Sequence, residues 1–235
     1  MLNVSNLQKT FGGLSALRGI SMTVPAKSII GILGMNGSGK TTLLNCINGL
    51  YIASDGEITL NGENLVGLNP NQVFTRGIGR TFQVPRIFPK MTLMENLAAP
   101  LLNTGMSNQE IEDAGREWLE RVELWRLRHN YGSELSGGQQ KLLELARVMV
   151  ARPKLVLLDE PFAGVNPSLA LLLIDLIRQM PERDGCSVLL VSHDLTSVYQ
   201  LSDHIVVMHE GSVLAEGDAE AVQNNPDVVE AYLGA

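Results

Sequence analysis

Four short apolar runs, each stopping at a glycine or a polar residue, dominate the hydrophobic pattern of this chain. They are SIIGIL at 28–33, LVLL at 155–158, SVLLV at 187–191 and HIVVM at 204–208. Continuous apolar runs of this length are typical of strands that are covered on both faces, as in a parallel sheet with helices on either side. In such sheets ligands gather at the carboxyl ends of the strands. The pattern therefore predicts an α/β fold with a mainly parallel sheet and a binding site at one edge.

The N-terminal part of the chain follows a different pattern. In GEITLNGENL, residues 56–65, apolar and polar positions alternate more closely, which places Ile58 and Leu60 on one face. Alternation of this kind indicates a strand with one buried face. Together with residues 2–24, this stretch predicts an N-terminal antiparallel β subdomain.

Between Pro89 and Pro153 the apolar residues recur at helical spacing. One stripe contains Ile111, Ala114, Trp118, Val122 and Trp125, and its aromatic members are better explained by packing than by a cofactor. We therefore predict a helical subdomain inserted at about residues 88–150. Without a repeat or an obvious linker, the chain is predicted to form a single domain over residues 1–235.

Composition narrows the possible partners. The chain has 235 residues and a formal net charge of −7, which disfavours a nucleic-acid partner and unaided binding to anionic lipid. Cys46 and Cys186 are too few for a disulfide framework and are expected to be small buried hydrophobes. The longest apolar run, 169–177, contains Asp175, so we expect no membrane span and, with no export signal, a cytoplasmic location.

The first candidate chemistry is a glycine-rich loop between a predicted strand and a predicted helix. GMNGSGKT matches the phosphate-binding pattern Gly-x-x-x-x-Gly-Lys-Thr in the context that this pattern requires. The glycines let backbone amides point at phosphates, the lysine reaches the outer phosphates and the threonine hydroxyl can ligate Mg²⁺. The predicted ATP-binding residues here are Gly34, Asn36, Gly37, Ser38, Gly39, Lys40, Thr41 and Thr42.

Two adjacent carboxylates follow the LVLL strand. Asp159 is placed to hold Mg²⁺, partly through water, and Glu160 is the candidate for polarising an attacking water. Adjacent carboxylates also occur on solvated loops, but a phosphate loop on a neighbouring strand favours the catalytic interpretation. Phosphoryl transfer depends mainly on positioning and charge stabilisation, so a modest base is sufficient.

Three further residues are candidates for the same site. His193 follows the SVLLV strand and can donate to the γ-phosphate, although an isolated histidine is often structural. Gln83, in RTFQ between the β subdomain and the helical segment, could sense Mg²⁺ or the attacking water. Phe11, in KTFGG, could stack on adenine, and core packing is a comparable alternative from residue type alone. The other histidines, His129, His204 and His209, are interpreted as structural.

A second glycine-containing loop, LSGGQQ at 135–140, raises the question of what it binds. Ser136 and Gln139 have the spacing of a capping box, which explains the serine. Amides of Gly137 and Gly138 at the start of a helix can also bind an anion. Because one nucleotide needs one phosphate loop, we predict that this motif closes on a γ-phosphate held by another subunit, head to tail.

These motifs, in this order, resemble the ATPase subunit of ATP-binding-cassette (ABC) transporters over essentially the whole chain. The resemblance implies a P-loop NTPase core of the RecA type, with ATP and Mg²⁺ as ligands. It implies that Phe11 is the adenine-stacking aromatic, that Gln83 belongs to the loop that contacts the metal, that Glu160 is the catalytic carboxylate and that His193 is the switch histidine. In FAGVNP, Asn166 replaces the aspartate that is usual in this loop.

FGGLSAL, RGIGRTFQVPRIFPKMTLMENL, FAGVNP and the terminal VVEAYLG are similar to the ATPase subunits of branched-chain (hydrophobic) amino acid importers. That resemblance implies transmembrane permease subunits, a second ATPase subunit that is identical or different, and an extracytoplasmic solute-binding protein. It places the chain at the cytoplasmic face of the inner membrane, attached through the permease around residues 82–97. Urea or amide importers and the lipopolysaccharide exporter ATPase carry similar motifs, and a soluble ABC-type ATPase is a further alternative.

Overall fold

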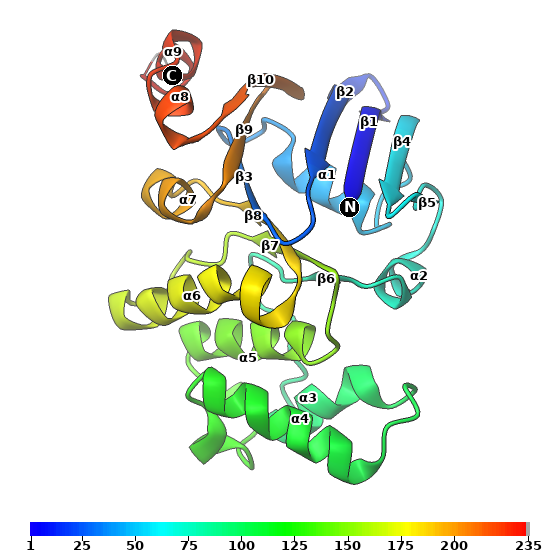
Figure 1. Ribbon diagram of the computed structural model, residues 1–235, viewed down its shortest axis with the longest axis vertical. Coiled ribbons are helices and arrows are strands. Elements are labelled where there is room, and N and C mark those ends of the chain that lie inside the picture. Colours follow the sequence, from blue (N-terminus) through cyan, green and yellow to red (C-terminus); the bar gives the residue numbers. More distant parts are fainter. Residues whose placement is uncertain (234–235) are drawn as a thin grey trace.

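The computed structural model describes residues 1–233 and contains two sheets (Figure 1). The first is antiparallel, with strand order β2-β1-β4-β5. Its strands are β1 (Leu2–Phe11), β2 (Leu14–Val24), β4 (Asp55–Leu60) and β5 (Glu63–Asn64). The antiparallel β subdomain predicted from residues 2–24 and 56–65 is therefore present.

The second sheet has the order β10-β9-β3-β8-β7-β6. Its strands are β3 (Ile29–Leu33), β6 (Ile78–Arg80), β7 (Leu155–Asp159), β8 (Ser187–Val191), β9 (His204–His209) and β10 (Ser212–Gly217). Neighbouring strands from β9 to β6 are parallel, and only β10 at the edge runs antiparallel to its neighbour. All four predicted strands are confirmed, whereas the short edge strands β6 and β10 were not predicted.

The central strands are covered on both faces, as their continuous apolar sequences predict. In β7, Leu155 and Leu157 face a core shared with the antiparallel sheet and helix α1 (Lys40–Ile47). Val156 and Leu158 face a second core, shared with helices of the other layer. The strands β3, β7 and β8 are thus packed between two cores, which determines where the residues at their carboxyl ends lie.

The other regular elements of residues 1–233 are helices. The longer ones are α4 (Asn108–Arg121), α5 (Gly137–Met149) and α6 (Pro167–Gln179); the shorter ones are α2 (Pro70–Thr75), α3 (Leu93–Ala98), α7 (Leu195–Leu201), α8 (Ala219–Gln223) and α9 (Pro226–Leu233). Short 3₁₀ turns lie at Ala99–Leu101, Trp125–Leu127 and Gly132–Glu134, and a π-helical turn at Met180–Asp184 extends α6.

Residues 88–150 contain α3, α4 and α5; α3 and α4 lie at the opposite end of the molecule from α8 and α9, and α5 lies between α4 and α6 (Figure 1). The apolar stripe of α4 packs into the same core as α5, with Trp118 and Val122 buried and Trp125 partly buried against them. The aromatic stripe therefore serves packing, as predicted. Among residues 1–233, no helix combines the length and apolar character needed to cross a membrane. Gly234, the last residue of the VVEAYLG motif, lies outside the described residues.

Candidate functional site

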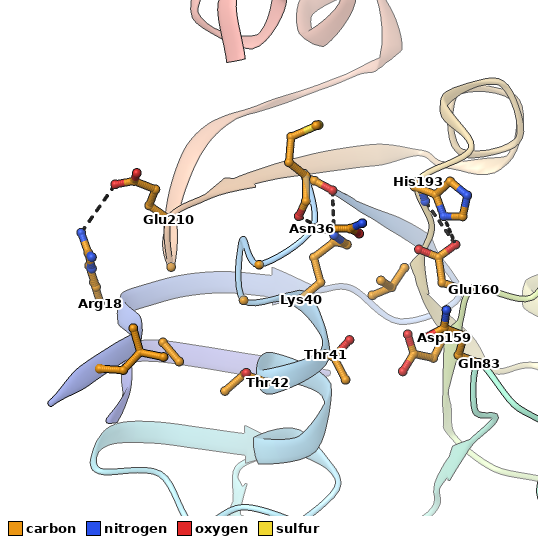
Figure 2. A pocket seen from close by; sticks show the side chains of 18 of the residues that line it. Arg18, Asn36, Lys40, Thr41, Thr42, Gln83, Asp159, Glu160, His193 and Glu210 are labelled. Carbon is orange, nitrogen blue, oxygen red and sulfur yellow. Dashed lines mark hydrogen bonds and ion pairs between the residues drawn. The ribbon is translucent and has the colours of Figure 1, made fainter. Parts of the chain in front are cut away.

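The carboxyl ends of β3, β7 and β8 border one cleft of about 1010 Å³. Figure 2 shows the side chains around this cleft. The predicted site residues that line it are Phe11, Gly34, Asn36, Gly37, Gly39, Lys40, Thr41, Thr42, Gln83, Asp159, Glu160 and His193. Residues that are up to 182 positions apart in the sequence thus meet at the carboxyl ends of the parallel strands, where the sequence pattern predicted a binding site.

The phosphate loop joins β3 to α1 through a backbone that only glycine adopts easily. Gly37 and Gly39 have φ angles of 82° and 105°, which lie in the left-handed region. At Gly39 a Cβ would also lie 2.8 Å from the carbonyl oxygen of Ala16. Ser38, within the loop, is buried, and its carbonyl accepts a hydrogen bond of 3.0 Å from the amide of Gly211.

Lys40 is the cation of this loop. Its Nζ donates to the carbonyl oxygens of Gly34 at 2.6 Å and Met35 at 3.0 Å. Burial lowers the pKa of Lys40, and the carboxylates of Glu160 and Asp159 oppose that shift. A buried ammonium at the start of a helix, facing two carboxylates, is suited to binding a polyphosphate with its metal.

Asp159 ends β7 in a buried ion pair. Its Oδ2 lies 3.1 Å from Nη2 of Arg80, and Nη1 of Arg80 donates to Oδ1 of Asn45 at 2.7 Å. Burial raises the pKa of Asp159, while the hydrogen bond and charge of Arg80 act in the opposite direction. Arg80 sits on the unpredicted edge strand β6, and sequence analysis missed it because an arginine in RTFQ carries no sign of burial.

The donor set fits Mg²⁺. Asp159, the Thr41 hydroxyl and the Gln83 amide all line the cleft. Among residues 1–233, no three acidic, histidine or cysteine side chains group as a metal cage. Mg²⁺ usually keeps several waters and binds one or two carboxylates together with substrate phosphates. The carboxylate, hydroxyl and amide oxygens beside the phosphate loop are of the kind that binds Mg²⁺ together with substrate phosphates.

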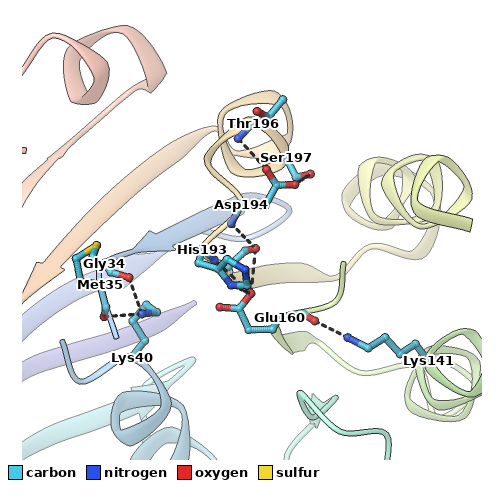
Figure 3. Close-up of polar contacts among 10 residues, drawn as sticks. Gly34, Met35, Lys40, Lys141, Glu160, His193, Asp194, Thr196 and Ser197 are labelled. Atoms are coloured by element: carbon cyan, nitrogen blue, oxygen red, sulfur yellow. Dashed lines mark hydrogen bonds and ion pairs between the residues drawn. The ribbon is translucent and has the colours of Figure 1, made fainter. Parts of the chain in front are cut away.

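Glu160 is held at both its backbone and its side chain. Its φ of 50° is unusual for a residue other than glycine and suggests strain at a functional position. Its amide donates to the carbonyl of Val191 at 2.8 Å. Its Oε2 accepts from the hydroxyl of Ser192 and the amide of His193, each at 3.2 Å, and lies 2.8 Å from Nδ1 of His193 (Figure 3).

Phe11 is not a core residue. Its side chain is 41% exposed at the edge of the cleft. The ring packs edge-on against Tyr51, with centroids 5.2 Å apart, and Nζ of Lys9 lies 4.8 Å from its centroid. An exposed aromatic ring at the mouth of a nucleotide cleft is available for stacking, so the core-packing alternative is wrong for this residue.

The second loop, Ser136 to Gln139, does not line the cleft. The capping box is confirmed: Ser136 Oγ accepts from the amide of Gln139 at 3.4 Å, and Gln139 Oε1 accepts from the amide of Ser136 at 3.0 Å. A Cβ on Gly138 would meet Cδ1 of Leu169, in α6, at 2.8 Å, whereas one on Gly137 would meet nothing within 4 Å. Gly138 therefore lies close against the end of the Leu169 side chain, whereas Gly137 faces open space.

Further residues near the cleft were not among the predicted site residues. Ser192 and Tyr232 contribute from the end of β8 and from α9, respectively. Lys141 and Glu144 reach toward the site from α5. Charged residues in a helix normally indicate a solvated face, so only their three-dimensional contacts identify these two.

Comparison with known proteins gives a consistent match. The ABC transporter family model matches residues 17–163, and a model described as "Branched-chain amino acid ATP-binding cassette transporter" matches residues 212–235. The chain is 40% identical to the high-affinity branched-chain amino acid transport ATP-binding protein BraF of Pseudomonas aeruginosa, covering 100% of this chain and 98% of the relative. It is 38% identical to LivG of Escherichia coli, with the same coverage.

Solved structures agree with this match. The ADP conformation of MJ1267, an ATP-binding cassette of an ABC transporter, superposes with a TM-score of 0.89 at 34% identity, covering 100% of this chain and 99% of that one. A dimeric structure of MJ0796, a bacterial ABC transporter cassette, gives a TM-score of 0.86 at 28% identity, covering 93% and 99% of the two chains.

Proposed function

Since this chain belongs to the ABC transporter family, we propose that it is the ATP-hydrolysing motor subunit of an importer for branched-chain or other hydrophobic amino acids. One observation carries the motor assignment: the phosphate loop, Asp159, Glu160 and His193 border one cleft, while Ser136 lies outside it. The full-length likeness to branched-chain amino acid transport ATP-binding proteins supports the substrate class.

The chain's own residues have separable roles in hydrolysis. Lys40 and the amides of the phosphate loop bind and orient the phosphates of ATP. Thr41, Gln83 and Asp159 would hold Mg²⁺, partly through water, and the bound ion would supply positive charge beside the phosphates. The carboxylate of Glu160 polarises the attacking water, and its contact with His193 places the imidazole where it can donate to the γ-phosphate.

The site is completed by a second ATPase subunit. Gly137 is unhindered by its own chain, and its amide, with the Ser136 hydroxyl, lies at the start of a thirteen-residue helix that favours an anion. We propose that these groups close on the γ-phosphate bound by the other subunit. Closure of this pair on ATP and opening after hydrolysis would be transmitted to permease subunits through the region around residues 82–97.

Reconstitution tests the proposed substrate. The chain is co-purified with its permease and partner ATPase, placed in proteoliposomes, and assayed for ATP hydrolysis with each candidate solute and its binding protein. We expect leucine, isoleucine or valine to stimulate hydrolysis, and a complex carrying Glu160→Gln to show no stimulation. Stimulation only by urea or an amide, or hydrolysis linked to lipopolysaccharide release, would replace the amino acid assignment.

A further inference from the structure

One face of α5 turns three charged side chains toward the loops of the chain's own cleft. Lys141, Glu144 and Arg147 are spaced by three residues, which places them in a row along a helix. Lys141 is 9% and Glu144 only 1% exposed. Charged groups buried to this degree need specific partners, and here the partners are backbone atoms of the site.

Lys141 holds the backbone of the proposed catalytic carboxylate. Its Nζ donates to the carbonyl oxygen of Glu160 at 2.7 Å (Figure 3). The amide of Glu160 is bound to Val191 on the opposite side. Because Glu160 has a φ of 50°, a conformation that costs free energy outside glycine, these two hydrogen bonds fix a residue that would otherwise relax.

Glu144 holds the loop that contains Gln83. Its Oε2 accepts from the amide of Phe82 at 3.1 Å, and its Oε1 accepts from the amide of Arg86 at 2.7 Å. The guanidinium of Arg147 donates to the carbonyl oxygen of Arg86. A carboxylate has two acceptor oxygens, one for each of these two backbone N–H groups. The side chain of a glutamine has only one acceptor oxygen and could not accept both bonds in the same way. The backbone on both sides of Gln83 is thus attached to α5.

We propose that Lys141 and Glu144 are positioning residues that couple the start of α5 to the hydrolytic geometry of its own chain. The same helix presents Ser136 to the partner's nucleotide and is hydrogen-bonded to the loops that contain Glu160 and Gln83 in its own cleft. When Ser136 engages a phosphate across the interface, any shift of α5 moves both loops together. This inference rests on the proposed function, which assigns catalysis to Glu160.

A purely structural role would give a different result. Burial lowers the pKa of Lys141, and the charge of the Glu144 carboxylate opposes this shift more than any other group. The two side chains could therefore simply compensate each other's charge. In that case their loss would lower stability without a selective effect on turnover. Positioning instead predicts a lower kcat at nearly unchanged ATP affinity, because binding depends mainly on the phosphate loop.

The test uses Lys141→Met, which keeps the length of the side chain, and Lys141→Arg, which keeps a donor for the Glu160 carbonyl. Both are measured in the full chain, with its partner ATPase present where hydrolysis requires it. We expect Lys141→Met to lower kcat at least tenfold, about 1.4 kcal/mol, with KM for ATP within twofold of wild type, and Lys141→Arg to restore most of the rate. Lys154→Met, at an exposed lysine, is the matched control and should behave as wild type.

Turnover of Lys141→Met within twofold of wild type would overturn the proposal, as would an equal loss in Lys141→Arg. If Lys141→Met fails to fold, Glu144→Gln provides the test: it should lower kcat without changing KM, and wild-type turnover there would be equally decisive. Glu160→Gln is measured alongside. Wild-type hydrolysis by Glu160→Gln would refute the catalytic assignment itself, whereas its inactivity together with a fully active Lys141→Met would refute only the inference about α5.

Discussion

Replacing Arg80 by methionine should destabilise the fold by more than any surface substitution, because it leaves Asp159 without its partner. Their ion pair is 3.1 Å long, and the two side chains are 3% and 6% exposed. Removing one partner of a buried pair typically costs about 3–5 kcal/mol, since the remaining charge is uncompensated. Native domains have total stabilities of roughly 5–15 kcal/mol, so this single change removes a substantial fraction.

Equilibrium unfolding in urea at pH 7 measures the effect, from the midpoint at constant m-value. The matched control is Arg116→Met, which breaks the exposed pair with Glu120 at 59% and 50% exposure. Its midpoint should coincide with that of wild type. The double variant Arg80→Met/Asp159→Leu, with no buried charge left in the pair, should be more stable than Arg80→Met alone. A change below about 1 kcal/mol in Arg80→Met, or no recovery in the double variant, would refute this reasoning.

Three further substitutions or treatments follow from the structure. Burial raises the pKa of Cys46 to about 11 and that of Cys186 to about 12, so neither thiol should react with a thiol reagent at pH 8 until the protein is unfolded. Both pKa values are raised from 9.0. The stability that the two protonated thiols contribute is therefore full below pH 9 and declines as the pH rises above it. Asn166 caps α6 by accepting from the amide of Leu169 at 3.0 Å, so Asn166→Ala should cost about 1 kcal/mol in thermal unfolding and Asn166→Asp almost nothing. Phe11→Ala should weaken ATP binding by about 1–3 kcal/mol, the usual worth of aromatic–base stacking, in a titration with ATP. It should lower the free energy of unfolding by only about 1 kcal/mol, because the ring also contacts Tyr51 and Lys9. A stability loss without an affinity loss would contradict a stacking role.

Local patterns in the sequence predicted the parts of the fold that depend on local chemistry. The apolar runs that become β3, β7 and β8 are explained by burial on both faces, and Gly34, Asp159 and His193, at or just after their ends, line the cleft. The S-x-x-Q spacing predicted the cap at Ser136 because its partners are three residues apart. Asn166 is the N-cap of α6. The sequence analysis noted only that it replaces the usual aspartate and did not predict this cap.

The missing parts depend on partners that are distant in the chain. Arg80 pairs with Asp159, 79 positions away, and its short strand gives no periodic signal. Gly138 lies against Leu169, and Glu144 accepts from amides 58 and 62 positions before it. A charged helix residue and a glycine after a serine each have a common local interpretation, so only the folded structure distinguishes the alternatives.

The central claim is that the unit of function is a pair of chains in which the second glycine loop of one closes on the nucleotide of the other. Size-exclusion chromatography with light scattering on Glu160→Gln, alone and mixed with the partner ATPase, tests it most directly. We expect a dimer with ATP and separate chains with ADP, and we expect Ser136→Arg in the same background to prevent the dimer while ATP still binds. Chains that remain separate with ATP under both conditions, or a dimer unaffected by Ser136→Arg, would contradict the account.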